Sequence, residues 1–149
     1  MGSEKFELEQ FLPYLLNQAA EASSLAFQQQ YKTRYGMLRT EWRVLFHLGL
    51  YGRMTASEIG TRARMHKTKI SRAVQRLAAQ RLLTRTRDAA DRRVEHLDLT
   101  EQGRAAYRDL HGVAARYDAT LADQFTDEEV TVLRRVLLKL SEGTGGSFT

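Results

Sequence analysis

The stretch that decides the fold is MTASEIGTRARMHKTKISRAVQRLAAQRLLTRTRDAADRRVEHLDLT, which spans residues 54–100. It opens with Thr55-Ala56-Ser57-Glu58, which has the form of a capping box, a hydroxyl and a carboxylate that satisfy free N–H groups where a helix begins. That helix is predicted to be short, ending at about Arg64. Met65-His66 then makes the turn into a second helix over about 67–80. A short helix, a tight turn and a second helix form a helix-turn-helix.

The second of these helices has one apolar face and one face without acids. On a helical wheel Ile70, Val74 and Leu77 fall on one side, flanked by Ala73, and are predicted to be buried. A solvated helix usually mixes charges of both signs, whereas a face that fits the major groove of DNA avoids carboxylates near phosphate. The alternative is a pair of ordinary core helices with a basic surface. The outward face carries Thr68, Lys69, Ser71, Arg72, Gln75, Arg76 and Ala79.

A positively charged hairpin is predicted after this helix. Residues 82–87 and 94–99 have β character with partial alternation, and the aspartates of residues 88–91 mark the turn between them. Arg92 and Arg93 follow at the tip. A two-stranded wing that presents arginine can reach the narrow minor groove, where the negative potential is deepest. Asp91, beside both arginines, is interpreted as their orienting partner and not as a catalytic acid.

The charge of the chain is concentrated in this region. Residues 61–93 contain eleven Lys/Arg and two Asp/Glu, a formal charge of +9. The whole chain carries +5, so the remainder carries −4. A basic segment on an otherwise mildly acidic chain is typical of a face that binds a polyanion, and the alternative is a solvated charged surface.

Long helices with apolar seams are predicted on both sides of this unit. Pro13 fits the first turn of a helix that runs to about Gln30, with a break expected at 31–36. A helix over about 39–50 follows, with Gly52 as its stop. The seam of the first helix consists of Leu12, Leu15, Ala19, Ala22 and Ala26.

The C-terminal third is also predicted to be helical. One helix runs from residue 100 to about 122, and Thr126-Asp127-Glu128-Glu129 is a second capping box that opens a helix to about Ser141. Val130, Leu133, Leu137 and Leu140 lie on one side of this last helix, and residues 143–149 are expected to fray. Because both ends of the chain are long, seamed helices, they are predicted to pair with those of a second copy.

Composition excludes several classes of protein. A length of 149 residues favours one domain, and the absence of cysteine excludes disulfides, thiolate metal sites and cysteine redox switches. No run of about 18 apolar residues occurs, so no membrane partner is expected. The polar start MGSEKFELEQ does not resemble a signal peptide, and a cytoplasmic location is expected. The four histidines have no metal-ligand spacing, so no metal, no cofactor and no enzymatic activity are predicted.

These pieces together resemble the MarR family of winged-helix regulators over about residues 11–140. The motifs that carry the resemblance are EWRVLFHLG at 41–49, MTASEIG at 54–60, KTKISRAVQRLAAQRLL at 67–83 and DAADRRVEHLDLTEQG at 88–103. The wing is the most specific of them. One departure is Gln80-Arg81, which stands where the family usually has a glycine as the helix ends. The family's wing pattern is matched here by Asp91, Arg92, Arg93, Leu99, Thr100 and Gly103.

The resemblance implies a single chain, 1–149, that is mostly α with a small β-hairpin wing. A winged helix-turn-helix lobe at 39–99 would lie between dimerisation helices at 11–35 and 100–141. It implies a two-fold homodimer on a pseudo-palindromic double-stranded operator, with Arg72 and Gln75 as the best candidates for base contacts. The predicted DNA-binding residues are Lys67, Thr68, Lys69, Ser71, Arg72, Gln75, Arg76, Asp91, Arg92 and Arg93.

The resemblance also implies a possible small-molecule effector, because family members often repress genes and release DNA on binding small, frequently aromatic anions. Aromatic side chains could stack on a ring, while Arg43 or His47 meets a carboxylate. The alternative is ordinary core, with Arg43 paired with Glu41 or another acid. The chain is therefore predicted to be a sequence-specific transcriptional regulator and is expected to be a repressor, and the alternative is a non-specific architectural DNA-binding protein without ligand control. Candidate lining residues are Tyr31, Tyr35, Met37, Trp42, Arg43, Phe46 and His47.

Overall fold

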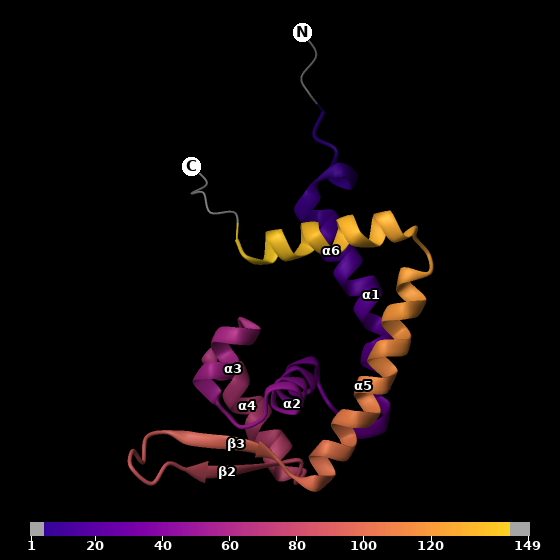
Figure 1. The fold of residues 1–149 in the computed structure, drawn as a ribbon. Helices are drawn as coiled ribbons and strands as arrows, with labels where there is room; N and C mark the ends of the chain where they lie inside the picture. The colour runs from indigo at the N-terminus through magenta and orange to yellow at the C-terminus, as the bar shows by residue number, and fades with distance from the viewer. Residues whose placement is uncertain (1–4, 144–149) are drawn as a thin grey trace. The chain divides into compact units, whose positions relative to one another are not determined.

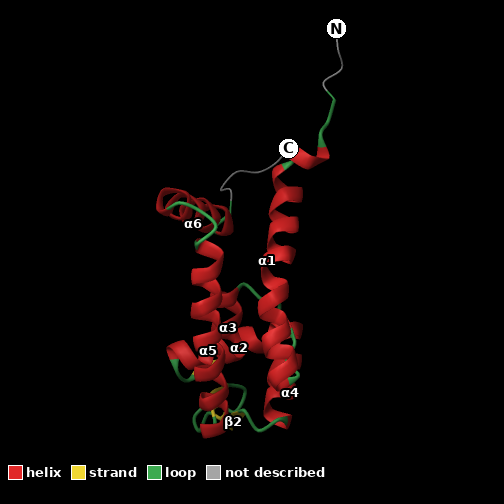
Figure 2. Cartoon of the chain, turned by 90° about the vertical axis from the view of Figure 1, so that its right-hand side faces the viewer, coloured by secondary structure: helices red, strands yellow, loops and turns green. Residues whose placement is uncertain are grey.

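Helices make up most of the chain in the computed structural model, which describes residues 5–143 (Figures 1 and 2). The predicted fold class, mostly α with a small β wing, is confirmed. Residues 1–4 and 144–149, with nearly all of the tail expected to fray, lie outside the described residues. The elements are a 3₁₀ turn Leu8–Gln10, α1 Leu12–Tyr35, α2 Arg39–Tyr51, β1 Met54–Thr55, α3 Ala56–Ala63, α4 Lys67–Ala79, β2 Leu83–Arg87, β3 Glu95–Leu99, α5 Glu101–Ala122 and α6 Asp127–Ser141.

The chain divides into two compact units, Met1–Val113 and Ala114–Thr149. The first contains one hydrophobic core, in which α2, α3 and α4 pack against one another and the sheet packs against α2 and α4. Apolar faces at helical spacing on α2 and α4 supply much of this core, because burial of such a stripe is what stabilises a short helix in water.

The helix-turn-helix begins at the predicted capping box. Thr55 Oγ1 accepts the Glu58 N–H at 3.1 Å, and Glu58 Oε1 accepts the Thr55 N–H at 3.2 Å. The helix α3 ends at Ala63 because Arg64 adopts a left-handed conformation with φ 54°. His66 caps α4, since its Nδ1 accepts the Thr68 N–H at 3.3 Å. The cap of α3 was predicted from the sequence, whereas His66 was predicted as part of the turn and also caps α4.

The wing contains one more strand than predicted. Its antiparallel order is β1-β3-β2, with Leu83 opposite Leu99, Arg87 opposite Glu95 and Met54 opposite Leu97. The two-residue strand β1, directly before the capping box, is too short to produce an alternating pattern. It ties the start of the helix-turn-helix to the middle strand of the wing.

The break expected within residues 31–36 is wrong. Helix α1 continues to Tyr35 and ends at Gly36, which has φ 63° and donates its N–H to Lys32 O at 2.9 Å. Tyr31 is buried at 1% exposure and its ring meets that of Trp42, so tertiary packing holds this last turn in the helix. Glycine pays no steric cost in the left-handed conformation, which places the stop at Gly36.

Thr100 and Gly103 join the loop after α4 to the start of α5. The Thr100 hydroxyl donates to Arg81 O at 2.7 Å and accepts the Gly103 N–H at 2.9 Å. A Cβ at Gly103 would collide with the backbone carbonyl of Leu82. Arg81, one of the two residues that stand where the family usually has a glycine, adopts a left-handed backbone conformation with φ 61°. These contacts give a physical reason for a threonine and a glycine at this spacing, and we call them the Thr100 clamp.

The second unit contains the end of α5 and α6. The predicted capping box of α6 is present, with Glu129 N–H on Thr126 Oγ1 at 3.1 Å and Thr126 N–H on Glu129 Oε1 at 3.0 Å. Arg134 donates to Asp118 at 2.7 Å. Large apolar side chains of α6 are exposed in the single chain. They include Val132, Leu133, Val136, Leu137, Leu138 and Leu140.

Candidate nucleic-acid interface

The helix α4 presents one buried and one exposed face, as the helical wheel predicted. Ile70, Ala73, Val74 and Leu77 are at most 3% exposed and belong to the core. The exposed side contains no acidic residue, so basic and hydrogen-bonding groups line it without an intervening carboxylate. The structure leaves exposed each predicted contact residue of this helix, namely Lys67, Thr68, Lys69, Ser71, Arg72, Gln75 and Arg76.

Arg76 differs from the other basic residues of this face because it also reaches inward. Its Nε lies 3.3 Å from Glu41 Oε2, a carboxylate on α2 that is completely buried. The expected alternative pairing of Arg43 with Glu41 is wrong. Arg43 Nη2 instead donates to Ala63 O, at the end of α3, at 2.6 Å. Sequence reasoning missed the Glu41–Arg76 pair because the two residues meet only when α2 packs against α4.

The wing tip holds Arg93 against Asp91, the residue expected to orient it. Asp91 Oδ1 accepts the backbone N–H of Arg93 at 3.0 Å and its Nε–H at 3.1 Å, and Oδ2 lies 3.2 Å from Nη2. These hydrogen bonds from Arg93 hold the pKa of Asp91 below its ordinary value. The Arg93 side chain is 90% exposed, so its direction is set while its outer surface stays accessible.

A second carboxylate, Asp88, organises the loop that carries these arginines. Its Oδ2 accepts the N–H groups of Ala90 and Asp91 at 3.0 and 2.9 Å, and its Oδ1 accepts His96 Nε2–H at 3.0 Å. The hydrogen bond from His96, followed by the two backbone bonds, lowers the pKa of Asp88. The aspartates in the sequence predicted a turn here, because an aspartate side chain often accepts the N–H two residues later. They did not predict that Asp88 organises the loop that carries the arginines. His96, on β3, could not be assigned from the sequence.

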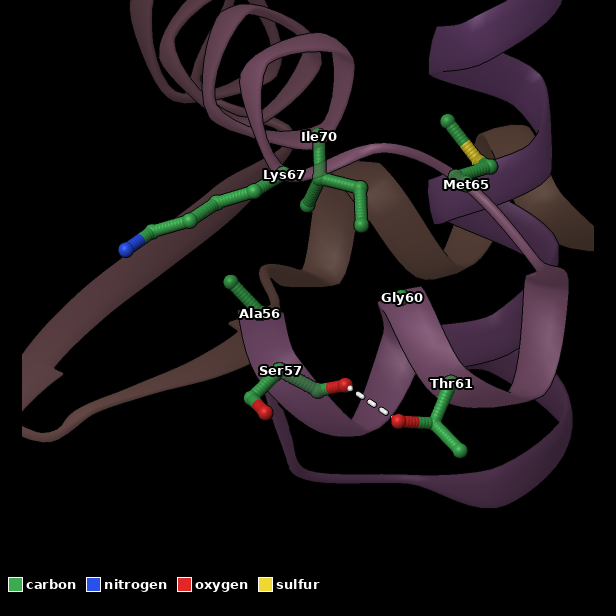
Figure 3. Close-up of a pocket in the computed structure, with 7 residues that line it drawn as sticks. All are labelled: Ala56, Ser57, Gly60, Thr61, Met65, Lys67 and Ile70. Atoms are coloured by element: carbon green, nitrogen blue, oxygen red, sulfur yellow. Dashed lines mark hydrogen bonds between the residues drawn. The ribbon is translucent and has the colours of Figure 1, made fainter.

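A shallow hollow of about 360 Å³ lies between α3 and the first turn of α4. Figure 3 shows Lys67 extending away from it, while Thr61 Oγ1 donates to Ser57 O at 3.2 Å. Gly60 lets the helices approach closely, since a Cβ there would lie 3.0 Å from Ile70 Cδ1. The full lining consists of Ala56, Ser57, Gly60, Thr61, Met65, Lys67 and Ile70, none of which is acidic.

The predicted effector residues separate into different environments. Trp42 and Phe46 join an aromatic cluster, with ring centroids 5.0 Å apart and Phe27 5.2 Å from Trp42. Tyr31 and Met37 are buried in the core. Arg43 and His47 each follow one of these aromatic residues on α2, so they point in a different direction from the aromatic cluster. His47 Nδ1–H donates to Arg43 O at 2.6 Å.

Tyr35 is directed to a different partner. Its hydroxyl donates to Asp109 Oδ2 on α5 at 2.7 Å, and Arg34 donates to the same carboxylate at 2.7 Å. Burial, and then the hydrogen bond with Asp109, raises the pKa of Tyr35 to about 12. The residue therefore links α1 to α5 in the single chain.

Two further observations bear on chemistry. Within residues 5–143, there is no cluster of at least three His, Asp or Glu side chains that could hold a metal ion. Over the same part of the chain, no helix has the length and hydropathy needed to cross a membrane.

Comparison with known sequences identifies relatives among transcriptional regulators. Residues 35–94 match the sequence model of the MarR family. The HTH-type transcriptional regulator YsmB of Bacillus subtilis (strain 168) is 27% identical over 89 residues, 60% of this chain, and the chain spans only 61% of the length of that relative. The HTH-type transcriptional repressor MdtR of the same organism is 27% identical over 113 residues, 73% of this chain and 70% of its own.

Solved structures share the fold over nearly the whole chain. The MarR family transcriptional regulator SPO1453 from Silicibacter pomeroyi DSS-3 aligns with a TM-score of 0.77 at 28% identity, covering 91% of this chain and 98% of its own. Bordetella bronchiseptica BpsR, whose DNA binding is regulated by 6-hydroxynicotinic acid, aligns with a TM-score of 0.84 at 22% identity, and the alignment covers 93% of this chain and 99% of BpsR. A mutant MarR from E. coli complexed with operator DNA aligns with a TM-score of 0.80 at 20% identity, and the alignment covers 93% of this chain and 99% of that MarR chain. Residues 35–94 thus match the MarR family, and the chain shares its winged-helix fold with MarR family transcriptional regulators.

Proposed function

We propose that the chain is a sequence-specific, double-stranded DNA-binding transcriptional regulator that acts as a homodimer. The observation that carries this proposal is the exposed, acid-free face of α4 beside a wing tip whose Arg93 is oriented by Asp91. Each copy inserts α4 into a major groove and places Arg92 and Arg93 at the flanking minor groove.

The contact residues have distinct chemical roles in this proposal. Arg72 and Gln75, one turn apart in the middle of the exposed face, read base edges, since arginine pairs with guanine and glutamine with adenine. Lys67 and Lys69, in the first turn of α4, bind phosphate as point charges. Thr68, Ser71 and Arg76 complete the face that enters or borders the groove.

The dimer is proposed to form through the helices at the two ends of the chain, 11–35 and 100–141. Phe11, Leu12 and Leu15 of the first and Leu133 and Leu137 of the last are 41–68% exposed in the single chain. Rows of exposed leucines are costly in water and are typical of helices that pair. Two lobes, 39–99 in each copy, would then meet half-sites about one helical turn apart.

Regulation is proposed to be repression that a small, aromatic anion relieves. The similarity to the repressor MdtR and the fold shared with BpsR support this proposal. The candidate residues are Tyr35, Trp42, Arg43, Phe46 and His47. Because they lie in different environments in the single chain, one anion would meet only part of this set, with its ring against Trp42 and Phe46. A ligand that binds only the conformation unable to hold DNA shifts the population away from DNA binding.

The DNA-binding proposal is tested by selecting bound sequences from random double-stranded DNA and measuring affinity across salt. We expect an enriched inverted repeat, a steep negative salt slope and a large preference over random DNA. A cognate-to-random ratio near one at physiological salt would identify an architectural DNA-binding protein instead. No binding at low salt would refute both functions.

The wing is tested by Arg93→Ala. We expect about a 10-fold loss of DNA affinity with the oligomeric state unchanged, because the side chain is exposed and its loss leaves the core intact. Arg53→Ala, which also removes an exposed arginine, serves as the control. Unfolding of the Arg93 variant would show that the arginine is structural.

A further inference from the structure

Glu41 is, among the described residues, the charged side chain that is completely buried. It lies in the first turn of α2 and heads the stripe that continues through Val44, Leu45 and Leu48, all of which belong to the core. Neither carboxylate oxygen has an aligned hydrogen bond within the described part of the chain. The cation beside it is Arg76 of the recognition helix, with Nε 3.3 Å from Oε2.

Stability alone gives no reason for a carboxylate at this position. Burial of a charge is costly, and the attraction of one partner rarely exceeds what an apolar side chain of similar volume would contribute. The other members of the stripe are valine and leucine, so an apolar residue would continue the pattern. The carboxylate is therefore best explained by what it does to Arg76.

Arg76 has two different environments along one side chain. Its Nε edge faces Glu41, while the side chain as a whole remains 54% exposed. Its Nη groups make no hydrogen bond with the described residues, so they are available to a partner outside the chain. Because the guanidinium is planar, fixing the Nε edge also fixes the direction of the Nη groups.

We propose that Glu41 is a positioning residue for DNA binding, which holds the guanidinium of Arg76 so that its Nη groups meet a DNA phosphate. The inference rests on the proposed function. A phosphate is favoured over a base because base contacts concentrate toward the N-terminal end of such a helix, whereas Arg76 lies in the last turn of α4, beyond both proposed base contacts, Arg72 and Gln75. Phosphate also matches the two-pronged geometry of arginine.

This proposal makes a prediction opposite to that of simple electrostatics. Replacing Glu41 by a neutral residue raises the net charge of each copy by one, which alone should strengthen binding to a polyanion. If Glu41 positions Arg76, the same replacement weakens binding, because Arg76 must then be ordered at the DNA.

The experiment measures DNA affinity for wild type, Glu41→Met, Arg76→Ala and the double variant on the selected operator across salt. We expect Glu41→Met to weaken binding about 5- to 10-fold and to have no effect in the Arg76→Ala background. The Arg76→Ala substitution should reduce the salt slope by about one. Glu21→Gln, which removes an exposed carboxylate of α1, is the charge-matched control and should bind as wild type or slightly more tightly.

Thermal unfolding separates positioning from folding. Glu41→Met should unfold at the same temperature as wild type, so its weaker DNA binding would not come from misfolding. Glu41→Gln, whose amide oxygen can still accept a hydrogen bond from Arg76 Nε, should bind DNA almost as tightly as wild type. Equal affinity of Glu41→Met and Glu21→Gln, or an equal loss with and without Arg76, would overturn the inference while leaving the proposed function intact. A wild-type protein that selects no DNA would overturn both.

Discussion

The residue Arg81 is held in a conformation that suits glycine better. Its φ of 61° lies in the left-handed region, which costs a residue with a Cβ about 1–2 kcal/mol. The clamp contact at this position uses only the backbone carbonyl, which Thr100 Oγ1 meets at 2.7 Å. The strain is therefore not required by any side-chain contact described in the structure.

We expect Arg81→Gly to increase the free energy of unfolding by about 1 kcal/mol, because the strain is relieved and the clamp is kept. Urea unfolding measures the change. Arg104→Gly, an exposed site inside α5, is the matched control and should lose about 1 kcal/mol. A loss of stability at both positions would show that the arginine side chain contributes at residue 81.

A second residue whose environment matters is Asp88, which bonds the backbone of the wing loop. We expect Asp88→Ala to weaken DNA binding while the core stays folded, because the loop carrying Arg92 and Arg93 loses two backbone hydrogen bonds and the bond from His96. Amide hydrogen exchange should become faster at Ala90 and Asp91. Asp98→Ala, which removes another wing carboxylate, is the control. Unchanged exchange in the Asp88 variant would contradict the role of this carboxylate.

At the scale of elements, α1 and α5 are joined by Tyr35 and Asp109. The folded state raises the pKa of Tyr35 to about 12, so folding holds this proton more tightly than the unfolded chain does. The stabilisation is fully present below the unfolded pKa, near 10, and is lost as the pH rises through about 12. The direction follows first from burial, which disfavours the charged phenolate, and then from the hydrogen bond that the neutral hydroxyl donates to Asp109.

The stability difference between wild type and Tyr35→Phe should therefore shrink as the pH rises from about 10 to 12. Denaturant unfolding at several pH values measures it, with Tyr14→Phe as a control whose hydroxyl makes no hydrogen bond within the described residues. A difference that stays constant over this range would show that folding does not raise the pKa of Tyr35.

The elements that were predicted correctly are those that local chemistry specifies. The caps at Thr55 and Thr126 and the buried face of α4 follow from residues within one or two turns of each other. The strand β1 and the last turn of α1 were missed, because pairing and packing with distant residues determine them. For the same reason the sequence predicted Arg76 at the surface but could not pair it with Glu41, 35 positions away.

At the scale of the whole molecule, we expect one exposed row on α6, formed by Leu133, Leu137 and Leu140, to control assembly. Leu137→Glu places a charge in that row and should shift the protein from dimer to monomer, with a parallel loss of operator affinity. Sedimentation or light scattering measures the mass. Leu138→Glu, on the same helix but about 100° away, is the matched control. A Leu137→Glu variant that remains dimeric would exclude this row from the interface.

The Thr100 clamp has a mechanical consequence. It joins the loop after α4 to the first turn of α5 through the Thr100 hydroxyl and through the close approach of Gly103 to the Leu82 carbonyl, so we expect the two ends to turn together. The thirteen residues of α4 form a lever about 18 Å long. A tilt of only about 3° at the clamped end would move Lys67 and Thr68 by about 1 Å, which is enough to break a hydrogen bond of the kind that the proposed function assigns to them. If the proposed function holds, small angular changes in α5 would therefore make or break DNA contacts at the far end of α4.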